Sequence, residues 1–365
     1  MNPRAGGAEA VSYEIARRLV QAGDSVEWFS ASFKGSSAEE TRDGVRFVRA
    51  GRQWSVHWSA FRHYRTSLAQ DFDVVIDEVN TIPFFTPVWA TIPTVMFIHQ
   101  LAREVWWYES PFPLNALGYL AEPRYLTVYR RVPVLTVSRS TQADLLRLNF
   151  QGPIVVIPQG REPIALQQVP KSTTPTFLFV GRLAPSKRVE HAIRALALFN
   201  IEGKGGVLRI VGDGSLRYRR ALERLVARLG VEDKVDFLGR VPASEKHHLM
   251  AESHALLMTS VREGWGLAVS EANACGTPAI VYDVPGLRDS VRNQVTGLVV
   301  PPRPEKLRAA MRRLTSDSNL YARLSTECAR WANSMSFDDT ARLVRDTLQQ
   351  ALTQGVTSPT TPLSR

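Results

Sequence analysis

Two carboxylates eight positions apart, Glu263 and Glu271, are the residues of this chain whose types and spacing most clearly indicate chemistry. A glycine-rich turn carries the first, and a helix that begins within the stretch carries the second. Strand-like residues 255–259 precede them, and the order of strand, glycine turn and helix presents unpaired backbone N–H groups to an anion. Five helical residues rise roughly 7–8 Å, about the span of a sugar diphosphate unit. Carboxylates cannot serve the anion itself, so we expect them to accept hydrogen bonds from hydroxyls. The pattern predicts a nucleotide-sugar site, with phosphates between two hydroxyl-bearing rings.

The cations that such a site needs follow another predicted strand, residues 176–180. Arg182 and Lys187 lie in a strand-to-helix turn, at the carboxyl edge of the sheet where ligands of such sheets bind. Arginine offers a fork to phosphate, and lysine a compact charge. A basic residue in such a turn is usually only solvated. Together with the Glu263 turn in the same domain, the two residues favour a phosphate clamp.

Three further positions have a functional and a structural interpretation. Gly6 and Gly7 would let the backbone approach a phosphate across an interdomain cleft, and a helix cap is the alternative. Glu9 follows in the first helical turn, where stabilisation by the helix dipole explains it. His99 ends the strand 94–98 and is well placed for a cleft, although a buried, hydrogen-bonded histidine is the rival interpretation.

The loop 239–242 closes a strand of the second half and leads into a helix. Its residues Arg240 and Val241 would hold a nucleobase through backbone groups. The structural interpretation is a helix start, with Ser244 as N-cap and Pro242 ahead of it.

Acidic residues lie at both ends of the predicted strand 73–77. Asp71 and Asp73 imitate a metal-binding Asp-x-Asp, but they lie before the apolar residues 74–76 of the strand, at the wrong edge, so we interpret them as a turn and strand start. At the correct edge, Asp77, Glu78 and Asn80 are candidates for an acceptor site. Their alternative role is to hydrogen-bond the loop to itself.

The segment 103–112 is rich in aromatic residues and contains Arg103, Glu104 and Trp106. Three interpretations stay open: an acceptor platform, a loop that dips into a membrane, or packing between domains.

Composition bounds the class of protein. The 365 residues suffice for two domains, and 44% apolar with 22% charged residues is typical of a globular chain. No apolar run reaches the length of a membrane span and no signal-peptide core is present, so we expect a cytoplasmic protein. Its two cysteines, Cys275 and Cys328, lack metal-ligand spacing, which favours a reducing compartment.

The net charge of +10 indicates either a merely basic surface or contact with anionic lipid or a polyanionic acceptor. The second interpretation would make the protein peripheral at the inner membrane face. We expect no nucleic-acid partner, because no recognition motif is present.

Strand-like and helix-periodic segments alternate throughout, which predicts an α/β fold of two tandem Rossmann-like domains. We expect an N-terminal, acceptor-side domain over 1–165, a nucleotide-sugar-binding domain over 166–335, a helix over 336–353 and a disordered tail over 354–365. A polar, proline-containing stretch, 168–175, is the predicted linker. The loop before the first helix has only four residues ahead of it, too few for a central strand, so the first strand of this domain is apparently missing. Either the true start lies upstream of Met1, which we favour, or the chain lacks this strand.

Taken together, these motifs resemble those of the retaining glycosyltransferases of family 4 (glycosyl transferases group 1), which have the GT-B fold. The resemblance covers nearly the whole chain and rests on segments 6–9, 180–183, 210–214, 263–271, 276–278 and 297–302. It implies two Rossmann-like domains facing a central cleft and a C-terminal helix that crosses back to the first domain.

The resemblance also implies a role for each site residue. Arg182 and Lys187 correspond to the diphosphate clamp, Glu263 to the contact with donor-sugar hydroxyls, and Glu271 to the partner of the ribose diol. His99 is similar to the active-site histidine, and Gly7 to the loop glycine facing the phosphate. The expected catalytic set is His99, Arg182, Lys187 and Glu263. The expected donor contacts are Gly6, Gly7, Arg182, Lys187, Arg240, Val241, Glu263, Gly264, Trp265, Gly266, Leu267 and Glu271.

The expected reaction is transfer of a hexosyl unit from a UDP- or GDP-sugar to a glycan, lipid-linked or small-molecule acceptor. We expect retention at the sugar carbon and no metal or other cofactor. Two alternatives stay open: a non-hydrolysing nucleotide-sugar epimerase, and a catalytically silent nucleotide-sugar-binding subunit. Gln159 departs from the Asn or Glu that relatives often carry before the glycine of the interdomain turn.

Overall fold

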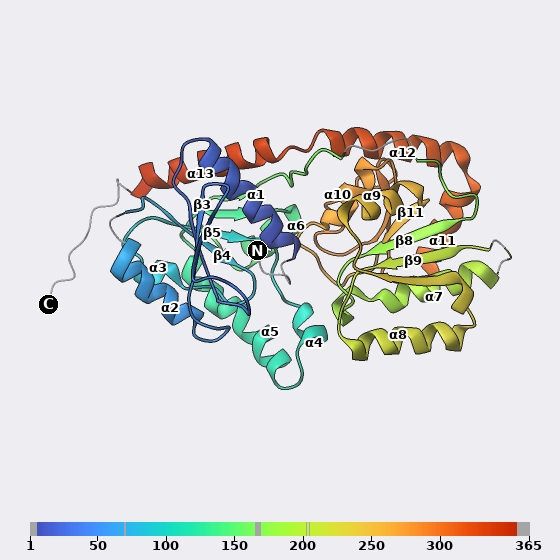
Figure 1. The fold of residues 1–365 in the computed structure, drawn as a ribbon, viewed down its shortest axis with the longest axis horizontal. Helices are drawn as coiled ribbons and strands as arrows, with labels where there is room; N and C mark the ends of the chain where they lie inside the picture. The colour runs from blue at the N-terminus through green and yellow to red at the C-terminus, as the bar shows by residue number, and fades with distance from the viewer. Residues whose placement is uncertain (1–5, 69–70, 165–168, 202, 204, 356–365) are drawn as a thin grey trace. The chain divides into compact units, whose positions relative to one another are not determined.

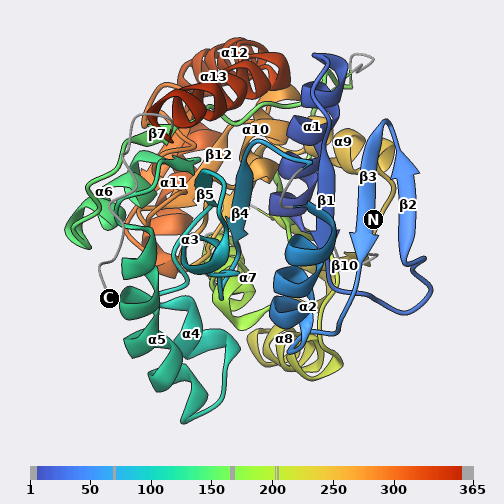
Figure 2. The same cartoon turned by 90° about the vertical axis from the view of Figure 1, so that its left-hand side faces the viewer.

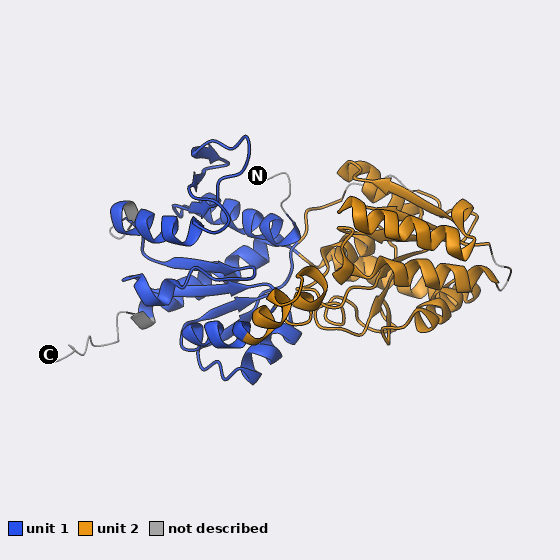
Figure 3. Ribbon diagram, turned by 90° about the horizontal axis from the view of Figure 1, so that it is seen from below, with its two compact units in different colours: residues 1–101, 121–160, 336–365 blue, residues 102–120, 161–335 orange. Residues whose placement is uncertain are grey.

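The computed structural model (Figure 1) describes residues 6–68, 71–164, 169–201, 203 and 205–355. It divides into two compact units, coloured separately in Figure 3: unit 1 comprises residues 1–101, 121–160 and 336–365, and unit 2 comprises residues 102–120 and 161–335. Both are α/β structures built largely on parallel strands, as the alternating pattern predicts. No helix among the described residues has the length and apolar character needed to cross a bilayer.

The described residues of unit 1 form two sheets. Its strands are β1 (Glu27–Ser30), β2 (Glu39–Arg42), β3 (Val45–Arg49), β4 (Val75–Val79), β5 (Thr94–Ile98), β6 (Val134–Thr136) and β7 (Ile154–Val156). One sheet has the order β4-β5-β6-β7 and is parallel throughout. In the other, whose strands lie side by side in Figure 2, β3 pairs with β1 in parallel and with β2 antiparallel. Every residue of β5 is buried, because a parallel strand inside such a sheet is covered on both faces.

The helical segments of unit 1 are α1 (Gly7–Gln21), α2 (Val56–His63), η1 (Tyr64–Leu68), α3 (Thr86–Trp89), η2 (Leu126–Tyr129), α6 (Arg139–Arg147) and α13 (Phe337–Gly355). Helix α5 (Leu114–Tyr125) begins in unit 2 and ends in unit 1.

The last helix, α13, is fixed to α1 by charged contacts. Arg18 Nε donates to Asp338 Oδ1 at 2.6 Å, and its guanidinium lies 5.1 Å from the centre of the Phe337 ring. Near the middle of the helix, Arg345 donates to both carboxylate oxygens of Asp24 at 2.9 and 3.0 Å. These contacts attach the C-terminal segment to the first half of the chain.

Unit 2 has one six-stranded parallel sheet in the order β10-β9-β8-β11-β12-β13. The strands are β8 (Thr176–Val180), β9 (Val207–Val211), β10 (Val235–Gly239), β11 (Ala255–Met258), β12 (Ala279–Tyr282) and β13 (Gly297–Val300). The helical segments are α4 (Val105–Glu109), η3 (Pro185–Lys187), α7 (Val189–Ile201), α8 (Leu216–Leu229), η4 (Glu232–Lys234), α9 (Ala243–Glu252), α10 (Leu267–Ala274), α11 (Pro304–Ser316) and α12 (Ser318–Asn333). This strand order is the doubly wound one, and its direction reverses between β8 and β11, where such sheets bind ligands.

The structure adds two strands that the apolar pattern does not predict, β2 and β13. All four residues of β2 are exposed, so the strand has no alternation that a sequence pattern can reveal. At the chain ends, α13 continues to Gly355, so the predicted disordered tail begins too early. Its remainder and the predicted missing first strand lie outside the described residues.

Lys171, within the predicted linker 168–175, is hydrogen-bonded to unit 2. Its ammonium group donates to the backbone oxygen of Ser253 at 2.8 Å and to Thr277 Oγ1 at 2.7 Å. Burial lowers the pKa of Lys171 from 10.5 to about 8, because the charged form loses hydration.

This lowered pKa predicts a pH dependence of stability. Between pH 8 and 10.5 the folded chain has released a proton that the unfolded chain retains, so the free energy of unfolding rises with pH. Lys171→Met lacks this titrating group. Across that window we therefore expect the free energy of unfolding of the wild type to increase relative to that of Lys171→Met, by at most about 1.4 kcal/mol per pH unit. Urea unfolding at intervals between pH 7 and 10.5 measures the difference, and a difference that does not change with pH would contradict the prediction.

Candidate functional site

Two interlocked loops follow β8 and β11 at the reversal point of unit 2. The hydroxyl of Thr259 donates to the backbone oxygen of Lys187 at 2.8 Å, and Val261 N donates to the backbone oxygen of Ser186 at 2.8 Å. In return, Arg188 Nε donates to the backbone oxygen of Thr259 at 2.9 Å. The turn that carries Arg182 and Lys187 is therefore built together with the loop that carries Glu263.

Lys187 and Glu263 form an ion pair at the centre of these loops. Lys187 Nζ donates to Glu263 Oε1, and Ser260 Oγ donates to the same oxygen at 2.6 Å. The side chains of Lys187 and Glu263 are only 22% and 13% exposed. The structure thus brings together a lysine and a carboxylate predicted from separate motifs. Sequence reasoning missed Ser260, which is fully buried and has no motif of its own.

The turn 285–286 packs against the backbone of the Glu263 loop. Glu263 N donates to the backbone oxygen of Pro285 at 3.1 Å. Gly286 has a φ of +81°, and a Cβ atom there would lie 1.9 Å from the backbone oxygen of Glu263. Only glycine fits this contact. A Pro-Gly pair is a turn signal in a sequence, but nothing in the sequence shows that this turn supports Glu263.

Helix α10 begins directly after the glycine-rich turn, as the sequence predicts. Gly266 precedes its first residue, Leu267, with a φ of 93° and without a side-chain cap, so the first N–H groups are available to an anion. Gly264 and Trp265 are half-buried, and the indole of Trp265 donates to Ser270 Oγ at 2.9 Å.

Glu271 lies one turn into α10 and has its own cation. Lys246 of α9 donates to both of its carboxylate oxygens, at 2.7 and 2.8 Å. The two carboxylates of the opening motif are therefore held by different lysines, Lys187 for Glu263 and Lys246 for Glu271. Lys246 lies in an ordinary polar helix, and no pattern in the sequence distinguishes it.

Arg182 is more exposed than Lys187, the other predicted phosphate ligand: 63% of its side chain is accessible, against 22%. Its Nη1 atom lies 3.3 Å from Glu109 Oε2. The turn that carries Arg182 packs against the loop after β9 and is hydrogen-bonded to the end of that strand. Gly181 N donates to the backbone oxygen of Val211 at 3.0 Å, and a Cβ atom at Gly212 would lie 1.9 Å from the backbone oxygen of Gly181.

The loop after β10 holds Arg240 and Val241 at the same carboxyl edge of the sheet. Arg240 is exposed and Val241 half-buried. The expected cap was wrong: α9 begins at Ala243 after Pro242, and Ser244 lies inside its first turn. Proline fixes its own φ near −57° here and lacks an N–H, so it starts the helix without a side-chain cap.

In unit 1, Asp77 turns out to be structural. It accepts hydrogen bonds from Phe84 N, from the backbone and hydroxyl of Thr86, and from the Tyr129 hydroxyl. Only 1% of Asp77 is exposed. Burial raises the pKa of Tyr129 well above its usual range, and the neighbouring Asp77 charge raises it further. Of the two roles considered for Asp77, the structure selects bonding within its own loop.

His99 and Glu78 face one another at the carboxyl edge of the β4–β7 sheet. Their Nε2 and Oε1 atoms are 3.4 Å apart, and the same Glu78 oxygen accepts from the Ser12 hydroxyl at 2.7 Å. The side chain of His99 is 12% exposed, and its ring is tilted by 37° against the ring of Phe97, with centroids 4.4 Å apart. Buried polar atoms without a hydrogen-bond partner among the described residues recur along this edge: His99 Nε2, Gln100 Oε1, Thr136 Oγ1 and Gln159 Nε2.

Gly6, Gly7 and Glu9 form the start of α1. Gly6 N donates to Glu9 Oε2 at 2.8 Å, which is the glutamate half of a capping box, and the helix begins at Gly7. Asn80 Nδ2 reaches Glu9 Oε1 at 3.5 Å. The helix-cap interpretation therefore holds for this loop, and its contact with a phosphate stays a prediction.

The aromatic segment belongs to unit 2 by its contacts. Glu104 pairs with Arg262 at 2.8 Å, and the Trp106 ring lies against Gly118. Trp107 and Phe112 are instead exposed, by 50% and 81%. Packing thus accounts for Trp106 but not for its exposed neighbours.

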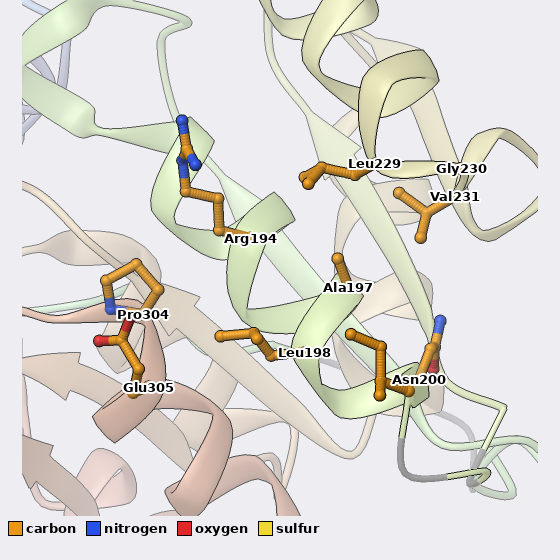
Figure 4. A pocket seen from close by; sticks show the side chains of 10 residues that line it. Arg194, Ala197, Leu198, Asn200, Leu229, Gly230, Val231, Pro304 and Glu305 are labelled. Carbon is orange, nitrogen blue, oxygen red and sulfur yellow. The ribbon is translucent and has the colours of Figure 1, made fainter.

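A separate cavity of about 470 Å³ lies along α7 (Figure 4). It is lined by Arg194, Ala197, Leu198, Asn200, Ile201, Leu229, Gly230, Val231, Pro304 and Glu305. None of these residues belongs to the predicted site. We place the site at the reversal point instead, because the charged groups and the helix N-terminus meet there.

Asp71 and Asp73, the aspartate pair before β4, belong to no metal cluster. In the regions that the structure describes, no group of three or more His, Cys, Asp or Glu side chains could hold a metal ion. Asp71 and Asp73 precede the first residue of the strand, Val75, as expected from the sequence.

Comparison with known proteins places both units in one family. Residues 161–331 match the family described as Glycosyl transferases group 1, and residues 5–163 match Glycosyltransferase Family 4. A D-inositol 3-phosphate glycosyltransferase of Rhodococcus opacus is 34% identical over 68% of this chain and 60% of its own length. An uncharacterized glycosyltransferase of Methanocaldococcus jannaschii is 32% identical over 53% of each chain. This chain spans about half the length, or less, of the first such relatives, with 53% and 40% covered.

Solved structures show the same fold at low identity. Sucrose-phosphate synthase from Thermosynechococcus elongatus superposes with a TM-score of 0.79 at 20% identity, over 96% of this chain and 94% of that one. HepE of Anabaena, in complex with UDP and glucose, gives 0.73 at 18% identity, over 94% and 96%. WaaG, a glycosyltransferase involved in lipopolysaccharide biosynthesis, gives 0.75 at 19% identity, over 94% and 96%. These likenesses confirm the predicted fold, and the chain belongs to glycosyltransferase family 4, the group 1 glycosyl transferases, with the GT-B fold.

Proposed function

We propose that this protein is a hexosyltransferase that uses a UDP- or GDP-sugar, retains the configuration of the sugar carbon and needs no metal or other cofactor. The observation that carries the proposal is the Lys187–Glu263 pair between the Arg182 turn and the start of α10. The two cations and the N–H groups at Leu267 would stabilise the leaving diphosphate, which is the role a divalent ion has elsewhere. HepE was crystallised with UDP and with UDP-glucose, which supports a nucleotide-sugar donor for this fold.

In this proposal each half has a separate task. Glu263 accepts hydrogen bonds from donor-sugar hydroxyls and Glu271 from the ribose diol, while Arg240 and Val241 line the base. The polar edge around His99 and Glu78 offers partners to the hydroxyls of a glycan, lipid-linked or small-molecule acceptor. The acceptor oxygen bonds to the sugar carbon on the face that the diphosphate leaves, and its proton passes to the leaving phosphate.

A donor panel tests the proposal. UDP- and GDP-hexoses are incubated with the purified chain, with and without EDTA, and free nucleoside diphosphate and sugar products are followed by NMR. We expect release of diphosphate from one donor class, unaffected by EDTA, and an α-linked product from an α-linked donor. Inversion of the linkage would overturn the proposed retention, and loss of turnover with EDTA would overturn the proposed independence of metal. Nucleotide binding without any turnover would favour the silent subunit, and conversion of the donor sugar without an acceptor would favour the epimerase.

We also propose peripheral contact with an anionic membrane through an apolar face on the segment 107–120. The exposed residues of this face are Trp107, Phe112, Leu114, Leu117 and Leu120, each at least 50% accessible. Leu114 and Leu117 share one side of α5 with the exposed Arg124, which follows them at helical spacing. A helix face with apolar side chains and a neighbouring arginine is typical of interfacial binding.

Substituting this face is expected to weaken membrane binding. Phe112→Ser with Leu117→Ser removes two large exposed apolar groups, at about 1.5–3 kcal/mol each if both are buried in lipid. Co-sedimentation with vesicles containing phosphatidylserine should fall by at least tenfold. A double substitution of exposed apolar residues on unit 1, Trp54→Ser with Val88→Ser, is the matched control. Equal binding by both double variants would contradict the assignment of this surface.

A further inference from the structure

A carboxylate from outside the motif region lies against the proposed phosphate clamp. Glu109 ends α4, and its two oxygens contact the turn after β8: Oε2 lies 3.3 Å from Arg182 Nη1, and Oε1 accepts from the Ser186 hydroxyl at 2.5 Å. Ser186 is only 4% exposed, whereas the Arg182 side chain is 63% exposed. Glu109 therefore binds one exposed cation and one buried hydroxyl of the same turn.

These are the contacts that a phosphate oxygen would make. An anion bound by Arg182 next to Glu109 would meet a like charge, which disfavours both groups at this distance. We propose that Glu109 is a positioning residue that holds Arg182 and Ser186 while the donor is absent, and that the donor diphosphate displaces it. The inference rests on the proposed function, because it takes Arg182 as a donor phosphate ligand.

The other end of the same segment is attached independently. Glu104 pairs with Arg262, whose side chain is 5% exposed. Burial would raise the pKa of Glu104, but the hydrogen bond and charge of Arg262 outweigh it and hold that pKa below its usual range. The ring of Trp106 also lies against Gly118. Displacement of Glu109 therefore frees the end of α4 and leaves its beginning in place.

Displacement lowers the apparent affinity for the donor. A ligand binds only those molecules in which Glu109 has left the turn. Its apparent dissociation constant is therefore the intrinsic constant divided by the fraction of such molecules, which makes it larger. The effect acts on ligands that carry the phosphates and not on the nucleoside alone. Glu109 would thereby favour nucleotides with enough negative charge to replace it.

Calorimetric titration of the full chain tests this inference. Wild type, Glu109→Gln and Glu104→Gln are titrated with UDP, GDP, uridine and guanosine, after circular dichroism has shown that all three proteins fold. Because an exposed ion pair contributes up to about 1 kcal/mol, we expect Glu109→Gln to bind the nucleoside diphosphate about two- to fivefold more tightly. Affinity for the nucleoside should not change. Glu104→Gln, which breaks a contact away from the clamp, should bind both ligands as the wild type does.

Steady-state kinetics provide a second readout. Glu109→Gln should lower KM for the donor by the same factor without raising kcat, and Glu109→Asp should return KM towards the wild-type value. Unchanged or weaker diphosphate binding by Glu109→Gln, or an equal gain in Glu104→Gln, would overturn the inference while the proposed function stands. Failure of all three proteins to bind either diphosphate would overturn the proposed function, and the inference with it.

Discussion

Replacement of Lys187 by alanine is expected to reduce kcat/KM for the nucleotide-sugar donor by about 10²- to 10³-fold, the cost of removing one preorganised charge from a transition-state site. The lysine is bound to Glu263, so its loss also releases the carboxylate that would orient the donor sugar. Glu263→Gln should have an effect of similar size, because an amide at that position no longer pairs with the ammonium group. Initial rates with a saturating acceptor and varied donor measure both variants.

The control for this experiment is Lys234→Ala. Lys234 is a half-exposed lysine of the same unit, and it pairs with Asp233 on η4 at 2.8 Å. We expect its kcat/KM to equal that of the wild type. Turnover by Lys187→Ala within a factor of three of the wild type, with the fold intact by circular dichroism, would sink the assignment of the donor site.

Substitution of Gly286, which supports the Glu263 loop, is expected to have a large effect on stability. In Gly286→Ala the new Cβ atom would lie 1.9 Å from the backbone oxygen of Glu263, at a φ of +81°. Either the Glu263 loop or the turn must then move. We expect a loss of about 2–4 kcal/mol in the free energy of unfolding, since backbone strain and steric overlap add. Transfer activity should fall as well, because the displaced loop carries Glu263, the carboxylate that we propose orients the donor sugar.

Gly230→Ala separates these two causes. Gly230 follows α8 with a φ of +63°, but a Cβ atom there would have no neighbour within 4 Å. It should lose only about 1 kcal/mol, from backbone strain alone, and retain its activity. Chemical denaturation of both variants measures the difference. Equal losses in the two would show that the contact with Glu263 has no consequence.

The elements that carry the expected donor site could be predicted well because their signals are local. Strand β8, the basic turn, strand β11, the glycine turn and α10 each follow from residue types that are adjacent in sequence. The prediction failed where the deciding partner is remote. Asp77 looked like an acceptor ligand because it ends a strand, and only the return of η2 brings the Tyr129 hydroxyl to it. Glu271 likewise acquires Lys246 from another helix.

The aromatic segment shows the same division within a single stretch of sequence. Trp106 and Trp107 are adjacent and chemically identical, so no pattern distinguishes them. The fold places the first against Gly118 and leaves the second half exposed. Glu109, two residues further on, carries no motif. Its contact with Arg182 depends on a turn 73 residues away.

For Glu263 and Glu271, the sequence by itself determined that one lies in a glycine turn after a buried strand and the other on the helix that follows. It determined this because strand, turn and helix depend on neighbouring residues, through steric limits on the backbone and the period of apolar side chains. Only the tertiary structure decided which cation each carboxylate meets, which glycine supports the loop, and that Glu109 already lies against the clamp. Those contacts join residues from 23 positions apart (Glu263 and Gly286) to 77 positions apart (Glu109 and Ser186). Charge and shape complementarity at such separations exists only once the fold has brought the residues together.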